Sequence, residues 1–140
     1  MSEKKIIIVD DEPCGLRGFR GIIGNHLRTK DINNVTIECF ENADDAIRSI
    51  TNAVKGGIAF VLTDLKLYKG EYDPDNKNNG VEVARAAMKC DIPVVVCSGE
   101  TNESSDLLAK LRALDPNIVV LQKPVSSERL RALVDQFINP

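Results

Sequence analysis

Five short apolar runs recur along this 140-residue chain, and they limit the folds open to it more than any other feature. The runs are residues 6–9, 35–39, 58–62, 94–97 and 118–121. Four of them contain no polar residue, which is typical of strands in a parallel sheet that helices cover on both faces. The second run includes Thr36 and Glu38, which favours a place at an edge of the sheet.

Between the runs, apolar residues recur at spacings of three and four, which places them on one face of a helix. These residues are Leu16, Phe19, Ile23 and Leu27; Ala43, Ile47, Ile50 and Val54; Leu107, Leu111 and Leu114; and Leu130, Leu133, Val134 and Phe137. Asn42, Asn102 and either Ser126 or Ser127 are suited to cap the starts of three helices. Strand and helix thus alternate five times, which predicts an α/β fold with a three-layer, doubly wound, five-stranded parallel sheet and five helices.

The charge and the length of the apolar runs exclude several classes of protein. A formal charge of −3 and a pI near 5.2 leave no basic surface that could hold a nucleic acid. The longest runs are about five residues, far short of the roughly 20 that span a membrane, and the first is too short for a signal-peptide core. We therefore expect one cytoplasmic domain over residues 1–140, with neither nucleic acid nor membrane as a partner.

The four cysteines are Cys14, Cys39, Cys90 and Cys97, and they form no C-x-x-C pair. Zinc and redox motifs depend on such close spacings. We expect four free thiols, as in a reducing compartment, and we expect Cys39 and Cys97 to behave as small buried apolar residues.

Polar side chains follow four of the five runs. They are Asp10, Asp11 and Glu12 after the first, Thr63 and Asp64 at the third, Ser98 and Glu100 on either side of Gly99 after the fourth, and Lys123, which precedes Pro124, after the fifth. The carboxyl ends of parallel strands share one edge of the sheet, where α/β proteins bind their ligands. We therefore expect these side chains to meet at that edge.

Crowded together, the carboxylates of Asp10, Asp11 and Asp64 would repel one another unless a cation or a proton neutralised them. An open cluster of oxygen ligands suits Mg²⁺, which needs only one or two carboxylates besides water and phosphate oxygens. Lys123 adds an ammonium group and Ser98 a hydroxyl donor. Such a set around a carboxylate nucleophile suits phosphoryl transfer, with an acyl phosphate as the product.

The segments Val9-Asp10-Asp11-Glu12-Pro13, Thr63-Asp64-Leu65, Cys97-Ser98-Gly99 and Lys123-Pro124 occur in this order at the ends of the predicted strands. Together they resemble the receiver (phosphoacceptor) domain of two-component response regulators, and the resemblance covers essentially the whole chain. It implies a flavodoxin-like topology and a stand-alone bacterial receiver domain without an output domain.

The resemblance also implies a role for each site residue. Asp64 would accept a phosphoryl group from a phosphohistidine on a sensor histidine kinase or a histidine phosphotransfer protein. Asp10, Asp11 and Asp64, with the backbone carbonyl of Lys66, would hold Mg²⁺. The protein would then relay the phosphoryl group or bind a downstream protein target, as a monomer or a weak homodimer. It would catalyse only its own phosphorylation and dephosphorylation.

Two further residues have implied roles. Lys123 would pair first with Asp64 and then with the phosphoryl group, and Ser98 would swing inward to hydrogen-bond a phosphoryl oxygen. In the family the bond after this lysine is commonly cis, so we predict a cis peptide between Lys123 and Pro124. Only about 5–6% of X-Pro bonds adopt that form.

The sequence departs from the family's pattern in four places. Val120 stands where the family often has an aromatic residue that moves with the serine. Residues 68–80 form a longer segment than usual before the third helix, which we interpret as an inserted loop: a lid, a partner contact or a plain surface loop. Lys66 and Glu100 have opposite charges beside the site, and a bridge between them would hinder a hydrolytic water, so we predict a phosphoryl lifetime of many minutes or longer.

The fourth departure is a row of glycines, Gly15, Gly18, Gly21 and Gly24, in the first predicted helix. Each weakens a helix by roughly 0.8–1 kcal/mol relative to alanine. The row indicates either a short or kinked helix or a surface on which a partner docks closely.

Two other functions compete with phosphoryl acceptance. A phosphorylation-independent protein-binding module on the same fold would explain Val120. A haloacid-type phosphatase also has a nucleophilic aspartate, but that family has a second aspartate two residues later, where this chain has Lys66.

Overall fold

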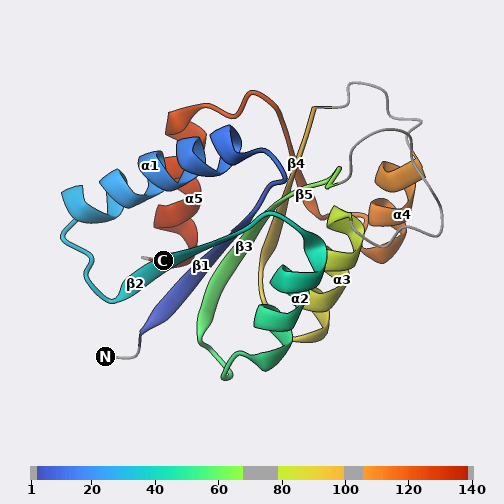
Figure 1. Cartoon of the computed structure of the whole chain (residues 1–140), viewed down its shortest axis with the longest axis horizontal. Helices are drawn as coiled ribbons and strands as arrows, with labels where there is room; N and C mark the ends of the chain where they lie inside the picture. The colour runs from blue at the N-terminus through green and yellow to red at the C-terminus, as the bar shows by residue number, and fades with distance from the viewer. Residues whose placement is uncertain (1–2, 68–78, 100–105, 139–140) are drawn as a thin grey trace.

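The computed structural model describes residues 3–67, 79–99 and 106–138 of the chain. Strands and helices alternate throughout, as the sequence predicts (Figure 1). The strands are β1 (Lys4–Val9), β2 (Val35–Phe40), β3 (Ile58–Asp64), β4 (Val94–Ser98) and β5 (Val119–Gln122). The helices are α1 (Pro13–Thr29), α2 (Ala43–Asn52), α3 (Gly80–Lys89), α4 (Asp106–Leu114) and α5 (Ser127–Ile138).

All five strands pair in parallel in the order β2-β1-β3-β4-β5. Helices α1 and α5 cover one face of the sheet, and α2, α3 and α4 cover the other (Figure 1). The predicted three-layer, doubly wound fold is therefore confirmed, and β2 is the expected edge strand. The strand order changes direction between β1 and β3, because β2 lies on one side of β1 and the later strands lie on the other. Ligands are therefore expected beyond the carboxyl ends of β1 and β3.

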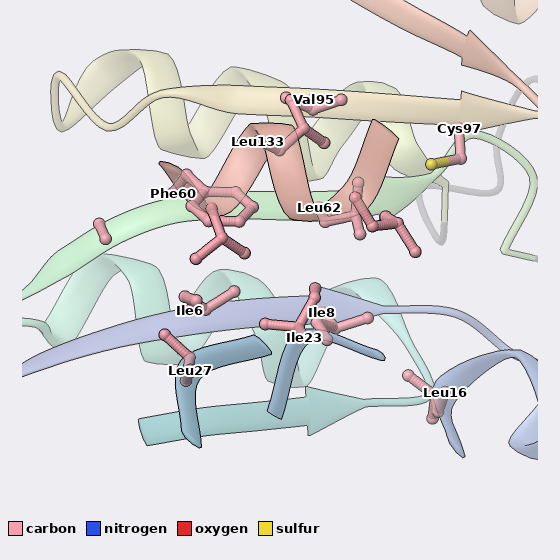
Figure 2. Packing of buried hydrophobic residues seen from close by; sticks show 13 residues of the cluster. Ile6, Ile8, Leu16, Ile23, Leu27, Phe60, Leu62, Val95, Cys97 and Leu133 are labelled. Atoms are coloured by element: carbon pink, nitrogen blue, oxygen red, sulfur yellow. The ribbon is translucent and has the colours of Figure 1, made fainter. Parts of the chain in front are cut away.

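Alternate residues of β1 and β3 enter separate cores on the two faces of the sheet. Figure 2 shows the core under α1 and α5, where Ile6, Ile8, Phe60 and Leu62 meet apolar residues of both helices. On the opposite face, Ile7, Val9 and Val61 pack against α2 and α3. Burial on both faces explains why these runs contain no polar residue.

The predicted helix caps are confirmed at the two positions that the structure describes. The side chain of Asn42 accepts a hydrogen bond from the Asp45 amide at 2.8 Å, and Ser126 Oγ accepts one from the Arg129 amide at 3.1 Å. Asn102 lies outside the described residues. The expectation for Val54 is wrong: α2 ends at Asn52, and Val54 is 78% exposed because it follows the last helical turn.

The glycine row does not shorten α1, which runs over 17 residues. Its apolar face supplies the reason, because Leu16, Ile23 and Leu27 are buried against the sheet. Packing of such a face outweighs poor intrinsic propensity.

All four cysteines are free; Cys97 is buried and Cys39 is only partly so. None of the helices, over the ranges the structure describes, is long and apolar enough to cross a membrane.

Candidate functional site

Four strand ends bring the predicted site residues to one edge of the sheet. Asp10 follows β1, Asp64 ends β3, Ser98 ends β4, and Lys123 follows β5. These strands are consecutive neighbours in the sheet, in the order β1-β3-β4-β5. Residues separated by more than a hundred positions therefore meet at the edge where the sequence places a ligand.

The three predicted metal-binding carboxylates lie together. Asp10, Asp11 and Asp64 each offer an oxygen, and these oxygens all lie within 4.8 Å of one another. Two ligands on opposite sides of a Mg²⁺ ion lie about 4.2 Å apart, since each is about 2.1 Å from the ion. The 4.8 Å limit on the oxygen–oxygen distances is close to that value, so the set of three carboxylates fits Mg²⁺. Lys66, whose backbone carbonyl is the fourth predicted ligand, follows Asp64 by two residues, and its side chain is exposed.

Lys123 bridges two of the carboxylates. Its Nζ donates a hydrogen bond to Asp64 Oδ2 at 2.9 Å and lies 3.5 Å from Asp10 Oδ2. Partial burial lowers the pKa of Lys123, but the bond to Asp64 and the charge of Asp10 outweigh it, so the pKa is raised overall. The lysine is therefore cationic at neutral pH and lies directly against the predicted acceptor. The peptide bond between Lys123 and Pro124 is cis, as predicted.

The pKa values of two acidic groups in the cluster are raised by burial and by the neighbouring negative charges. Burial raises the pKa of Asp64, Lys123 lowers it, and the charges of Asp10 and Asp11 raise it again, with a raised value as the net result. The pKa of Asp11 is also raised, by partial burial and by the charges of Asp10 and Glu12. Both groups therefore resist ionisation, which is the situation that a bound cation relieves.

Asp10 is only 1% exposed, and α1 lies directly over it. Its Oδ1 accepts a hydrogen bond from the Glu12 amide at 3.0 Å. A Cβ atom on Gly15 would overlap Asp10 Oδ2. Sequence reasoning saw Gly15 only as one member of a glycine row; its role in making room for the carboxylate depends on a contact that no local pattern reveals.

Gly80 is a second residue whose contact with the site the sequence did not reveal. A Cβ atom there would overlap the backbone carbonyl oxygen of Asp64, so the start of α3 lies on the predicted acceptor's own peptide group. The late position of this glycine in the chain was visible in the sequence, but not what it touches.

The remaining predicted features differ in how far the structure describes them. Ser98 is buried at the end of β4, and its carbonyl accepts a hydrogen bond from the Lys123 amide at 2.9 Å. Val120 is half-buried against the apolar cluster under α4. Glu100, one partner of the predicted bridge with Lys66, and residues 68–78 of the predicted insertion lie outside the described residues.

An apolar groove of about 460 Å³ lies beside the site, between α1 and the start of α5. Asp10 and Lys123 line it together with the apolar residues Phe19, Ile22 and Leu130. Gly15 and Gly18 line it too, so the absence of side chains at these positions helps to keep it open.

No protein-family model and no curated protein matches this sequence. Solved structures do match its fold. The response regulator receiver protein from Sinorhizobium medicae is 24% identical with a TM-score of 0.68, and the match covers 98% of this chain and 95% of that one. A receiver domain protein from Clostridium thermocellum is 22% identical with a TM-score of 0.70, over 97% and 94% of the two chains.

A third similar structure is the phosphorylated cyanobacterial phytochrome response regulator RcpA, 21% identical with a TM-score of 0.67 over 99% and 96% of the two chains. At these identities the likeness concerns the fold. The chain has the flavodoxin-like fold of response regulator receiver domains over nearly its whole length.

Proposed function

We propose that this chain is a response regulator receiver domain that accepts a phosphoryl group on Asp64 from a phosphohistidine partner in two-component signalling. One observation carries the proposal. The Asp64 carboxylate lies 2.9 Å from the Lys123 ammonium, and the carboxylates of Asp10 and Asp11 lie on the same site. The receiver fold supports a signalling module rather than a classical enzyme.

The chemistry follows from the groups present. A carboxylate oxygen of Asp64 attacks the phosphorus atom, the phosphorus–nitrogen bond of the phosphohistidine breaks, and its electron pair returns to the imidazole. The product on this chain is an acyl phosphate. The Lys123 ammonium pairs with the phosphoryl group once Asp64 no longer carries the charge, and the Ser98 hydroxyl donates to a phosphoryl oxygen after moving toward it.

Asp10, Asp11 and Asp64, with the Lys66 carbonyl, would hold Mg²⁺. The ion supplies positive charge that offsets the charge on the transferring oxygens. The protein itself holds the three carboxylates close together. Burial and the charges of neighbouring carboxylates raise the pKa values of Asp11 and Asp64, so both groups are harder to ionise without a bound cation.

The proposed partners are a sensor histidine kinase or a histidine phosphotransfer protein as donor, and a histidine phosphotransfer protein or another protein target downstream. Receiver domains among the similar structures support this class of partner. We propose a cytoplasmic location, where such donors act.

Val120 favours one alternative, a protein-binding module that works without phosphorylation. The family often has at this position an aromatic residue that moves with the serine, and this chain has a valine instead. On that alternative the site would bind Mg²⁺ without acquiring a phosphoryl group.

The test is phosphorylation by a small donor. The purified chain is incubated with Mg²⁺ and acetyl phosphate or phosphoramidate, and its intact mass is followed over time. We expect the wild type to gain one phosphoryl group and Asp64→Asn to gain none. EDTA should suppress the gain in the wild type. A folded wild type that binds Mg²⁺ and never gains mass would contradict the proposal and support the binding module.

A further inference from the structure

The peptide group between Asp64 and Leu65 is held from two sides by residues outside the predicted catalytic set. On one side, the hydroxyl of Thr63 donates a hydrogen bond to the Asp64 carbonyl oxygen at 2.9 Å. Thr63 is 1% exposed, so this bond is shielded from water. Because breaking this bond would leave a buried hydroxyl and a buried carbonyl without a partner, the bond fixes the orientation of the carbonyl.

On the other side, Gly80, the first residue of α3, lies in close contact with the Asp64–Leu65 peptide group. The Gly80 amide donates to the Leu65 carbonyl, which belongs to the next peptide group, at 2.8 Å. A Cβ atom on Gly80 would overlap the Asp64 carbonyl oxygen and lie 2.8 Å from Leu65 Cα. Only glycine therefore allows α3 to approach this closely.

The helix that delivers Gly80 is itself anchored. Asn79 is buried and caps α3, with its side chain accepting hydrogen bonds from the Val81 amide at 3.0 Å and the Glu82 amide at 3.3 Å. Across the sheet, the Leu65 amide donates to the Cys97 carbonyl at 2.8 Å. The peptide group after Asp64 thus has hydrogen-bond partners on β3 and β4, and Gly80 of α3 lies against it.

We propose that Thr63 and Gly80 are positioning residues for the acceptor: by holding the Asp64–Leu65 peptide group, they aim the Asp64 carboxylate at Lys123 and at the acidic cluster. The inference rests on the proposed function. The carboxylate and this carbonyl are both attached to the Cα atom of Asp64, so a displacement of the peptide group that shifts this Cα atom also shifts the carboxylate. The Lys66 carbonyl, two residues later, moves with the same segment. Misplacement of a reacting group by about 1 Å can cost a factor of about 10² in rate.

A purely structural role is the competing explanation, and the chain offers variants that separate the two. Thr63→Val removes the hydroxyl and keeps the shape, whereas Thr63→Ser keeps the hydroxyl. Gly80→Ala adds the atom that would displace the Asp64 peptide group. Ile58→Val is the matched control, since Ile58 is buried at the opposite end of the same strand.

Two quantities are measured for each folded variant: the rate constant of phosphorylation by phosphoramidate at saturating Mg²⁺, and the dissociation constant of Mg²⁺ alone by calorimetry. Urea denaturation gives the stability of each. Thr63→Val should lower the rate constant roughly three- to tenfold, the effect of one hydrogen bond. Gly80→Ala should lower it further, and both substitutions should weaken Mg²⁺ binding because Asp64 is a predicted ligand. Thr63→Ser and Ile58→Val should keep wild-type values of both.

Wild-type rate and Mg²⁺ affinity in Thr63→Val and Gly80→Ala, whatever their stability, would overturn the positioning role. Equal losses in Ile58→Val would do the same, because the effect would then follow stability alone. If the wild type binds Mg²⁺ but takes up no phosphoryl group, the proposed function fails, and the Mg²⁺ affinities still decide whether the two residues aim the carboxylate. A wild type that binds no Mg²⁺ would overturn both proposals.

Discussion

At the scale of single residues, Asp11 lowers the stability of the folded protein at neutral pH because the fold holds its carboxylate among other acidic groups at the predicted Mg²⁺ site. Its pKa is raised above the ordinary 3.8, first by partial burial and then by the charges of Asp10 and Glu12. Below pH 3.8 the group is protonated in the folded and unfolded states alike, and it costs nothing. As the pH rises from 3.8 through the raised folded value, the unfolded state loses this proton more readily than the folded state does, and stability falls.

We therefore expect Asp11→Asn to be more stable than the wild type at neutral pH, by a margin that shrinks as the pH falls toward 3.8. Urea denaturation across this range measures the margin. Millimolar Mg²⁺ should narrow it by stabilising the wild type more than the variant. A margin that grows toward acidic pH would contradict the assignment.

The cysteines differ in reactivity because of where the fold places them. Burial raises the pKa of Cys97 to about 12, and its side chain has no exposed surface. Cys14 and Cys90 are exposed. Since the thiolate is the reactive form, iodoacetamide should label Cys14 and Cys90 of the native protein and leave Cys97 unmodified.

Peptide mapping by mass spectrometry measures this labelling, with urea-denatured protein as the control in which every thiol reacts. Native labelling of Cys97 as fast as that of Cys90 would mean that the β4 end of the site opens to solvent.

At the scale of the element, α1 shows the same substitution acting in two directions. Apart from its chain neighbours and the nearby backbone of α1, a Cβ atom on Gly21 would meet no atom within 4 Å, whereas one on Gly15 would overlap the Asp10 carboxylate. Gly21→Ala should therefore stabilise the protein by roughly 0.8–1 kcal/mol, the difference in helix propensity. Gly15→Ala should cancel that gain or reverse it, because Asp10 must move.

Urea denaturation at neutral pH compares the two variants directly. Gly15→Ala should also weaken Mg²⁺ binding, since Asp10 is a predicted ligand, and Gly21→Ala should not. Equal stabilisation by both substitutions would show that Asp10 leaves the space under α1 without cost.

The elements were the most predictable part of the protein. Continuous apolar runs predicted the strands because both faces of the sheet are covered. The end of α2 was missed because Val54 continues the apolar spacing of that helix, although the chain leaves the helix after Asn52 and exposes the valine. The spacing of apolar residues shows which side chains could share a buried helical face. Where the helix ends, which the spacing does not show, decides whether the last of them is buried.

At the scale of the whole molecule, one polar contact ties α1 to α5. His26 is buried, and its Nε2 lies 2.8 Å from Asp135 Oδ1, although 109 residues separate them in sequence. The pKa of Asp135 is lowered, chiefly by the hydrogen bond with His26. A lowered pKa means that the contact stabilises the fold above pH 3.8 and that this stabilisation is lost as the pH falls through the folded value.

A double-mutant cycle with His26→Leu and Asp135→Ala tests this contact. At neutral pH, Asp135→Ala should destabilise the wild type more than it destabilises the His26→Leu variant. The difference should disappear at strongly acidic pH. Additive effects at neutral pH would show that the two side chains contribute independently.

The sequence by itself determined the order of strands and helices and the residue types at the strand ends, because period and chemistry are local properties of the chain. It therefore predicted that Asp10, Asp64, Ser98 and Lys123 would share one edge. Only the tertiary structure decided which groups touch: Gly15 against Asp10, Gly80 against the Asp64 peptide, and His26 against Asp135. These contacts arise when separate elements pack, and no local pattern specifies the partner that packing will supply.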